Sequence, residues 1–277
     1  MHLDLLESPD VTWSVCVRDD GGMPQGWLGA DVPLRTASVG KILLLLTAAR
    51  AVTVGSLGAR EPLTREDADW VGDSGLWHTL AVDTLPACDV AALVGAVSDN
   101  LATNVLLRRV GLDAVAGTAA YLGLTQTALH DQVRPERGPG HPLTLSTGTA
   151  GELSSLAHRV MREEACGPAA DSLVRGWLSA NTDQSMVGSA FVEHAGLDPL
   201  AHHVSLSPDL LYWNKTGTDA GVRADVGSVS RDGRTISWAA IANWDASEGL
   251  AATEQARLWT VMRGMRHIGE EILDALA

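Results

Sequence analysis

The chain has 277 residues, of which 45% are hydrophobic and 19% charged, a composition typical of a folded globular protein and too apolar for a disordered one. Its formal net charge of -14 would repel phosphate backbones and anionic lipid headgroups, so we expect neither a nucleic-acid nor a membrane partner. The cysteines are odd in number and form no C-x-x-C pair, which disfavours a disulfide framework and a zinc site; they are Cys16, Cys88 and Cys166.

The N-terminus does not have the pattern of a signal peptide. Residues 1–8 contain no basic region and no long apolar stretch, so we expect a cytoplasmic protein. The longest apolar run, residues 42–46, is far shorter than the roughly 20 residues that span a bilayer. No membrane-spanning segment is therefore expected.

The first part of the chain predicts a β-hairpin followed by a buried helix. Residues 11–18 alternate as in a strand, and a turn-rich stretch separates them from a second short strand near residues 27–30. From Ser38 the chain is largely apolar as far as residue 55, which predicts a buried helix. Ser38 and Lys41 would then lie one helical turn apart.

The middle of the chain is predicted to be mostly helical and the last third mostly strand. Helical patterns cover residues 86–110 and 146–180, whereas residues 130–143 are rich in Pro and Gly and predict a surface loop. Three strand patterns follow between residues 209 and 244, and a final helix begins near residue 247.

The simplest assembly of these elements is an α+β fold. Strands from both chain ends would form one antiparallel sheet flanked by helices, with an all-α subdomain inserted between them. We expect a discontinuous α/β subdomain of residues 1–40 and 205–277 and a helical subdomain of residues 41–204.

Three short motifs carry the chemistry of the chain. They are Ser38-Val39-Gly40-Lys41, Ser98-Asp99-Asn100 and Lys215-Thr216-Gly217. Each alone is weak, but the first opens an apolar helix, the second lies in the helical middle and the third is in a strand. Their order is the one used by class A β-lactamases and penicillin-binding proteins.

Lysine usage supports a chemical role for these motifs. The chain has 18 Arg and only two Lys, Lys41 and Lys215, and both lysines lie inside motifs. A serine hydroxyl needs a neighbouring base to become a nucleophile, and burial can make a lysine amine such a base. Arginine stays protonated in proteins, so it cannot replace a lysine in that role.

The motifs and their surroundings resemble the class A β-lactamase-like serine hydrolases of the penicillin-recognising serine acyl-enzyme superfamily. The similarity extends from about Val11 to the end of the chain. It includes the segments VGDSGL, SDNLATNVLLRRVG, YLGLTQTAL and KTGTDAGVRADVG. The resemblance implies the β-lactamase/transpeptidase-like fold.

The resemblance also implies a role for each motif residue in the acylation step. Ser38 would form the acyl-enzyme, with Lys41 as its base and Ser98 relaying the proton to the leaving amine. Asn100 would orient Lys41 and the substrate, and Lys215 would add positive charge.

Further residues of the third motif and the strand after it would bind the substrate. Thr216 and Arg223 would bind a substrate carboxylate, beside Gly217. The oxyanion hole would consist of the backbone N–H groups of Ser38 and Thr218.

One departure from the family pattern concerns release of the acyl group. Class A enzymes carry a Glu in an R-x-E-P-x-L-N loop after the second motif, and Val133 is near that place here. Asp131 and Glu136 are the nearby acids, and either could be a solvated loop charge or a replacement base. Without such a base we expect slow hydrolysis of the acyl-enzyme.

The predicted function is therefore hydrolysis of a β-lactam amide at a limited rate, with a role in antibiotic resistance. The alternatives are a cytoplasmic amidase, esterase or acyltransferase with another substrate, and a protein that binds β-lactams or peptides without hydrolysis. The expected partner is a small acyl amide or ester with a carboxylate.

We expect no cofactor and no metal. His194 and the pair His202 and His203 have no carboxylate or cysteine at ligand spacing. Trp77 and Trp213 could line a pocket, but core packing is the more common role of such residues.

Overall fold

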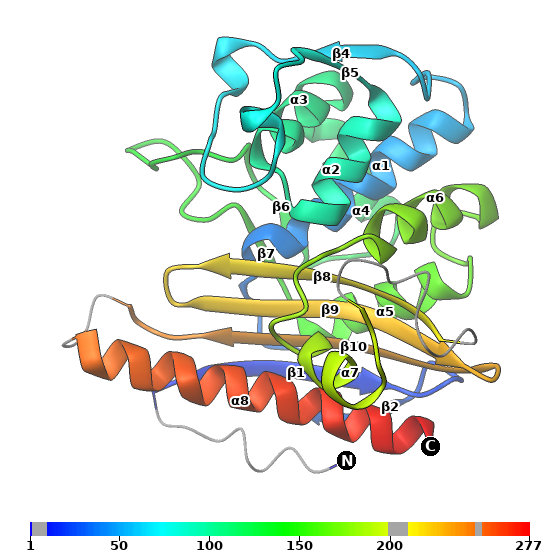
Figure 1. The fold of residues 1–277 in the computed structure, drawn as a ribbon, viewed down its shortest axis with the longest axis vertical. Helices are drawn as coiled ribbons and strands as arrows, with labels where there is room; N and C mark the ends of the chain where they lie inside the picture. Colours follow the sequence, from blue (N-terminus) through cyan, green and yellow to red (C-terminus); the bar gives the residue numbers. More distant parts are fainter. Residues whose placement is uncertain (2–9, 199–209, 247–250) are drawn as a thin grey trace.

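In the computed structural model, which describes residues 1, 10–198, 210–246 and 251–277, a five-stranded sheet lies below a helical part (Figure 1). The sheet order is β2-β1-β10-β9-β8, and every neighbouring pair is antiparallel. The strands are β1 (Thr12–Arg18), β2 (Pro24–Leu28), β8 (Leu211–Asp219), β9 (Val222–Arg231) and β10 (Arg234–Asn243). The prediction of one sheet built from both chain ends is confirmed.

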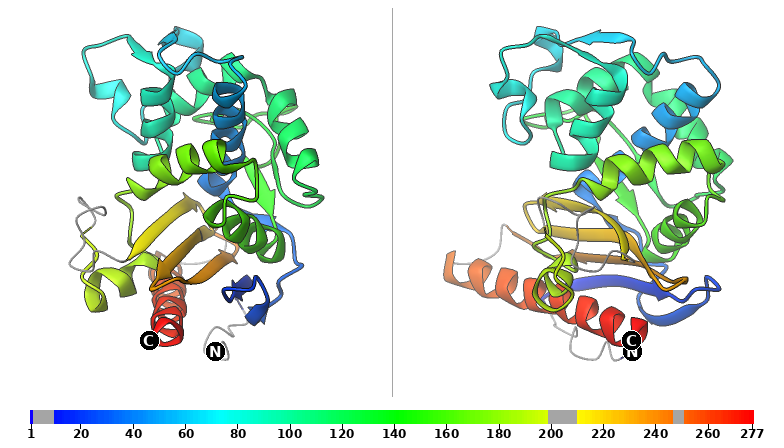
Figure 2. Two further views of the ribbon diagram at one scale, coloured as in Figure 1. Left: turned by 90° about the vertical axis from the view of Figure 1, so that its right-hand side faces the viewer. Right: turned by 45° about the vertical axis from the view of Figure 1, so that its right-hand side comes forward.

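Helices cover both faces of this sheet. α8 (Ala251–Leu276) and α7 (Gly188–His194) lie on one face, and α5 (Ala150–Met161) lies on the other (Figure 2). The strand residues alternate between two cores: Trp238 packs with α7 and α8, while its neighbour Ala239 packs with α5. This alternation is the period-2 pattern of a sheet buried on both sides.

The helical part surrounds α1, which is buried along most of its length. Residues 41–49 are all buried, as expected for a helix that is apolar on every side. Trp77 and Trp213 are fully buried in this core and do not line a pocket. The helices are α1 (Lys41–Thr53), α2 (Ala87–Val97), α3 (Asn100–Val110), α4 (Leu112–Tyr121) and α6 (Pro168–Ser179).

Two of the predicted helical stretches are interrupted. Residues 86–110 form α2 and α3, because Ser98 adopts a left-handed conformation (φ 54°) that ends α2. Asp99 then caps α3 by accepting from the backbone N–H of Ala102 at 2.8 Å. Residues 146–180 contain a short strand and two helices, with Gly167 (φ 96°) preceding α6.

The remaining elements are short strands and 3-10 turns. They are β3 (Leu34–Arg35), β4 (Pro62–Thr64), β5 (Thr84–Pro86), β6 (Ala128–Leu129), β7 (Ser146–Gly148), η2 (Ala37–Gly40), η3 (Asp67–Asp69) and η4 (Trp77–Thr79). Residues 130–143 contain neither helix nor strand, as predicted for a loop.

The two-subdomain division stays a prediction. Its second boundary, between residues 204 and 205, lies outside the described residues, as do most of residues 1–8. α5 and α7 come from the stretch assigned to the helical subdomain, yet they lie on the sheet. Among the described residues, no helix is both long enough and apolar enough to cross a membrane.

Candidate active site

The 3-10 turn η2 presents Ser38 at the start of α1. Ser38 is partly exposed, whereas Val39 and Gly40 are buried. The backbone N–H of Lys41 donates to the Ser38 carbonyl, and side chains three residues apart in such a turn lie on the same side. Ala37 has a φ of 47°, a conformation that is rare for a residue with a Cβ and that is often found at functional sites.

The side chain of Lys41 is buried and fully engaged. Its Nζ donates to the Ser98 carbonyl at 2.7 Å and to Asn100 Oδ1 at 2.6 Å, and it lies 3.3 Å from Ser98 Oγ. Burial, followed by the positive charge of Lys215, holds the pKa of Lys41 well below its ordinary value. Burial and the neighbouring positive charge thus favour the uncharged amine, which is the form that can act as a base.

Lys215 reaches the same serine from the sheet. Its Nζ donates to Ser98 Oγ at 2.9 Å and to the Thr216 carbonyl at 2.8 Å. Burial lowers the pKa of Lys215 to about 8, so this lysine is mostly protonated at neutral pH. The hydroxyl of Ser98 therefore lies between two amines, and Lys41 is the one that loses its proton more readily.

Asp99 holds a rim segment, residues 72–77, against α3. Its Oδ2 accepts from the backbone N–H groups of Leu76 and Trp77, both at 2.7 Å, and the Asn100 N–H donates to the Ser74 carbonyl at 3.1 Å. Gly75 is required in this segment, because a Cβ there would lie 2.3 Å from Asp99 Cγ and its φ is +103°. The middle residue of the second motif is thus an anchor for the rim.

The rim segment brings a carboxylate to the site that the sequence interpretation missed. Asn100 Nδ2 donates to Asp73 Oδ1 at 2.5 Å, while the other end of the same amide holds Lys41. Asp73 lies inside the VGDSGL segment, which is part of the resemblance, but no role was predicted for Asp73 itself. Its contact depends on how the rim is attached to α3, which spacing alone does not show.

The third motif packs directly on the turn that holds Ser38. A Cβ on Gly217 would lie 2.2 Å from the Thr36 carbonyl oxygen and 3.2 Å from the Ser38 nitrogen, so only glycine permits this approach. The Ser38 backbone N–H thus lies close to Gly217 of β8, and Thr218 is the next residue of that strand. The two predicted oxyanion-hole residues are brought together.

A second carboxylate that the sequence interpretation missed supports Thr216. The Thr216 hydroxyl donates to Asp183 Oδ2 at 2.7 Å. Burial alone would raise the pKa of Asp183, but hydrogen bonds from Ser185 and Thr216 lower it. Asp183 follows α6 in an irregular segment, so no periodic pattern marked it.

Arg223 lies opposite Thr218 across the β8–β9 pair. Its Nη1 donates to the Val222 carbonyl at 2.7 Å and the Asp219 carbonyl at 3.1 Å, and its guanidinium carbon lies 5.8 Å from the centre of the Trp244 ring. The side chain is therefore held at the end of β9 beside the third motif.

The loop of residues 130–143 holds an aliphatic side chain where the resemblance implied a carboxylate. Asn104 on α3 accepts from the Val133 N–H at 2.8 Å and donates to the Val133 carbonyl at 2.9 Å, and the Val133 side chain is buried in the core. Asp131 is engaged by Arg134 and Arg137, and Glu136 is exposed and makes no hydrogen bond to a described residue.

The Asp131 carboxylate is held in its charged form. Burial alone would raise its pKa, but hydrogen bonds from Arg134 and Arg137 lower it. A carboxylate bound to two arginines is a weak proton acceptor, so Asp131 is poorly suited to activate water.

Within the described part of the chain, no group of three or more His, Cys, Asp or Glu is arranged to hold a metal ion. His194 lies 3.9 Å from Glu270 on the α8 face of the sheet, while His202 and His203 lie outside the described residues. The three cysteines are free thiols.

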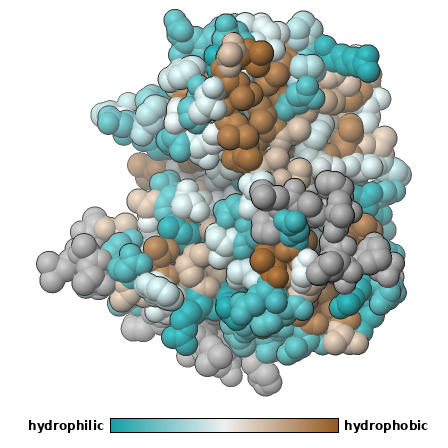
Figure 3. All heavy atoms as spheres, in the orientation of Figure 1, coloured by the Kyte–Doolittle hydropathy of each residue, from teal (hydrophilic) through white to brown (hydrophobic). Residues whose placement is uncertain are grey.

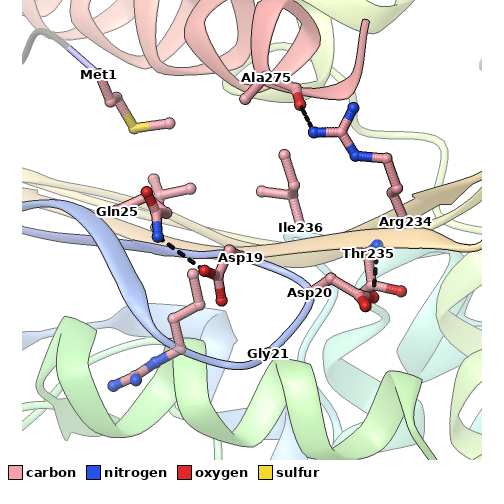
Figure 4. A pocket seen from close by; sticks show the side chains of 11 residues that line it. Met1, Asp19, Asp20, Gly21, Gln25, Arg234, Thr235, Ile236 and Ala275 are labelled. Atoms are coloured by element: carbon pink, nitrogen blue, oxygen red, sulfur yellow. Dashed lines mark hydrogen bonds between the residues drawn. The ribbon is translucent and has the colours of Figure 1, made fainter.

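A cavity of about 320 Å³ lies at the other end of the sheet and takes no part in this site (Figure 4). It lies between the β1–β2 and β9–β10 turns and the end of α8. Its two carboxylates already accept hydrogen bonds, Asp19 from Gln25 and Asp20 from the Thr235 N–H. It offers no group that the motifs need.

The comparison with known families decides the affiliation. A family model described as the β-lactamase enzyme family matches residues 4–258. The chain belongs to the β-lactamase enzyme family. The resemblance inferred from the three motifs is confirmed, and the protein is a β-lactamase-like serine hydrolase. No curated protein sequence matches the chain.

Solved structures of β-lactamases and a related protein share the fold. A β-lactamase from Sphaerobacter thermophilus has 22% identity and a TM-score of 0.82, covering 99% of this chain and 95% of that one. A mutant of PBP-A, in an acyl-enzyme complex with penicillin G, has 19% identity and a TM-score of 0.76, covering 97% and 91%. The β-lactamase/transpeptidase fold predicted from the sequence is confirmed.

A third structure comes from a class A β-lactamase. It is a variant of the enzyme of the last common ancestor of Gram-negative bacteria, bound to a nitrobenzotriazole transition-state analogue. Its identity is 22% and its TM-score 0.75, and the match covers 98% of this chain and 97% of that one. Two of these relatives thus hold small molecules.

Proposed function

We propose that the protein is a class A-like serine hydrolase that acylates Ser38 with a β-lactam, or a similar acyl amide that carries a carboxylate, and releases the acyl group slowly. The observation that carries this proposal is the position of the Ser98 hydroxyl, within 3.3 Å of Lys41 Nζ and 2.9 Å of Lys215 Nζ. One amine can take a proton there, and the other supplies positive charge.

Lys41 is the base for acylation. An uncharged amine has two N–H groups and one lone pair, and the Ser98 carbonyl and Asn100 Oδ1 take both hydrogens. The lone pair is then left for a hydroxyl proton. As the Ser38 oxygen attacks the carbonyl carbon, its proton passes to Lys41 Nζ and the negative charge develops on the carbonyl oxygen.

Collapse of that tetrahedral species completes acylation. The carbonyl re-forms, the carbon–nitrogen bond breaks, and the Ser98 hydroxyl gives its proton to the leaving nitrogen while Lys41 returns a proton to Ser98. The backbone N–H groups of Ser38 and Thr218 stabilise the oxyanion. Lys215 and Arg223 attract the substrate carboxylate, and the Thr216 hydroxyl binds it by turning its hydrogen away from Asp183.

Hydrolysis of the acyl-enzyme needs a base for water. Water adds to the ester carbon, the bond to the Ser38 oxygen breaks and that oxygen regains a proton. The loop offers the aliphatic Val133 at the expected position, and general-base catalysis typically contributes about 100-fold or more. We therefore expect a long-lived acyl-enzyme and little protection against antibiotics.

The Val133 position also favours a second candidate function. An acyl-enzyme that water attacks slowly can pass its acyl group to an amine or alcohol, so an acyltransferase, amidase or esterase with another substrate fits the same residues. The acceptor would compete with water for the ester carbon.

Intact-mass spectrometry with a fluorescent penicillin tests the proposal. We expect a mass increase equal to the whole penicillin, lasting many minutes, that is absent from Ser38→Ala. Adding amine acceptors should shorten its lifetime if the protein is an acyltransferase. Non-covalent binding, with no adduct and no product, would instead assign a binding protein, and rapid turnover of nitrocefin would contradict slow release.

A further inference from the structure

We propose that Asp73 makes this site select acyl donors whose acyl side chain carries a positive charge, such as a protonated amine. This inference rests on the proposed acylation of Ser38 and specifies its substrate class. It begins with the hydrogen bond from Asn100 Nδ2 to Asp73 Oδ1 at 2.5 Å.

Asp73 is fixed in place by its neighbours. The segment is fastened to α3 by the bond from the Asn100 N–H to the Ser74 carbonyl and by two backbone bonds to Asp99. Gly75 packs directly against Asp99, since even a Cβ at position 75 would collide with Asp99. The carboxylate therefore keeps its position when a ligand enters.

Asp73 forms no ion pair with a cation of the described residues. The loop acid Asp131 is bound by two arginines, and Asp69 is bound by Arg108. Asp73 is exposed, its Oδ2 accepts no hydrogen bond from the described residues, and none of them forms an ion pair with it. The lysine of this region, Lys41, binds the other end of the Asn100 amide and forms no ion pair with Asp73.

The two sides of the site thus carry opposite charges. The β8 side carries two cations, Lys215 and Arg223, against one carboxylate, Asp183, which is bonded to Thr216, so its net charge is positive and suits a carboxylate. The α3 side (Asp73 and Asn100) is negative, and the two sides meet at Ser98. A substrate whose carboxylate lies on the β8 side extends its acyl group toward the α3 side. An acyl group that carries a positive charge is attracted to the carboxylate on the α3 side.

The rim beside Asp73 is also apolar. Leu76, Leu80 and Val82 are among the exposed large hydrophobic residues, and Figure 3 shows apolar surface gathered over the helical part. An acyl group with both an ammonium and an apolar ring would match this rim better than a polar one.

Penicillin G and ampicillin form a suitable pair of probes, because they differ only by an amino group in the acyl side chain, on the carbon next to the side-chain amide carbonyl. The experiment measures the second-order acylation rate of the full chain by each compound at about pH 6.5, below the pKa of about 7.7 that is typical of an α-amino group. The readout is the ratio of the two rates.

We expect Asp73→Asn to lower the ratio of ampicillin to penicillin G by about fivefold, the effect of one exposed ion pair. Asp73→Glu should keep the ratio, and so should the matched control Asp67→Asn, an exposed acid of η3 away from Asn100. In the unmodified protein the preference should disappear at a pH where the amine is neutral.

Five outcomes would overturn the inference. An equal ratio in the unmodified protein and Asp73→Asn removes the charge effect. An equal loss of both rates in Asp73→Asn and Asp73→Glu makes Asp73 a structural anchor of Asn100. Unchanged acylation with a longer-lived adduct makes it a base for water. Adducts without any preference overturn this inference alone, whereas no adduct with either penicillin overturns the proposed function as well.

Discussion

Two neighbouring amides on α3 organise very different surroundings. Asn100 binds Lys41 on one side and Asp73 on the other, and one turn later Asn104 binds the backbone of Val133 through two hydrogen bonds. The first region gathers charged groups around a serine. The second is held just as firmly but ends in an aliphatic side chain.

The two regions differ in the side chain at residue 133 and not in how firmly the loop is attached to α3. The two bonds from Asn104 fix the backbone at residue 133, so a carboxylate at that position would have a defined place. In the proposed mechanism the first region supplies the groups that form the acyl-enzyme, while the second lacks a carboxylate that would activate water. The proposal therefore predicts faster acylation than release.

Lys41→Arg should have the largest effect and would break the first region. Arginine keeps its proton, so acylation should fall about 1000-fold. Intact-mass measurements of adduct formation against time provide the rate, and the thermal unfolding midpoint monitors the fold. The control Arg50→Lys on the same helix should leave the rate unchanged. Rapid acylation of the Lys41→Arg variant would contradict the role of Lys41 as base.

Gly217→Ala tests the close contact between β8 and the turn of Ser38. The added Cβ would lie 2.2 Å from the Thr36 oxygen, so β8 must move away. We expect about 100-fold slower acylation and a loss of about 1–3 kcal/mol in the free energy of unfolding. Denaturant titration and adduct kinetics measure the two effects.

Gly176 in α6 provides a matched control for this substitution. A Cβ there meets nothing within 4 Å, so Gly176→Ala should raise the free energy of unfolding by about 0.5–1 kcal/mol and leave acylation unchanged. Equal behaviour of the two alanine variants would show that the contact at Gly217 is unimportant.

Val133→Glu should sharpen the contrast by restoring a carboxylate to the second region. We expect the adduct lifetime to shorten by about 100-fold, because the new carboxylate can act as a base for water. Burial of the carboxyl should lower stability by at least about 1 kcal/mol. Release of product is followed by mass spectrometry after removal of free penicillin.

Two variants separate charge from other effects in the loop. Val133→Gln has similar size without the charge and should leave the lifetime long. Glu136→Gln should change it by less than about twofold, since Glu136 is exposed and unengaged by the described residues. A shortened lifetime in Val133→Gln, or a lengthened one in Glu136→Gln, would contradict this assignment.

The pH dependence of acylation probes the pair of lysines. Lys215 has a pKa of about 8, so it loses its charge as the pH rises through that value, and acylation should fall about tenfold for each further unit. Rates measured across that range test this. A rate that stays level to well above pH 8 would contradict a role for the Lys215 charge.

Stability should change with pH in the opposite direction. The unfolded chain has the ordinary lysine pKa of 10.5, so between about pH 8 and 10.5 it binds more protons at Lys215 than the folded chain does. The contribution of this group to the free energy of unfolding therefore rises with pH over that window.

The sequence was sufficient where chemistry follows from local patterns. The sheet from both chain ends, the buried helix after Ser38 and the meeting of the three motifs were all predicted. Ser98 shows the limit of helical periodicity, since one left-handed residue divides a continuous apolar pattern into two helices. Nothing in the spacing of apolar residues marks such a break.

The two unpredicted carboxylates lie in irregular segments. Asp73 reaches Asn100 because Asp99 and Gly75 fasten the rim to α3, and Asp183 reaches Thr216 from the connection after α6. Contacts of this kind depend on the paths of loops between distant elements. Their positions become visible only when the whole fold is assembled.

The burial of both lysines has a practical consequence for chemical labelling of amines. The sequence contains no other lysine, and Lys41 and Lys215 are each 0% exposed, so the surface carries no ε-amine at all. An amine-selective reagent should therefore leave both lysines of the folded chain unmodified. Modification of Lys41 or Lys215 would report that the contacts between α1, α3 and β8 had opened.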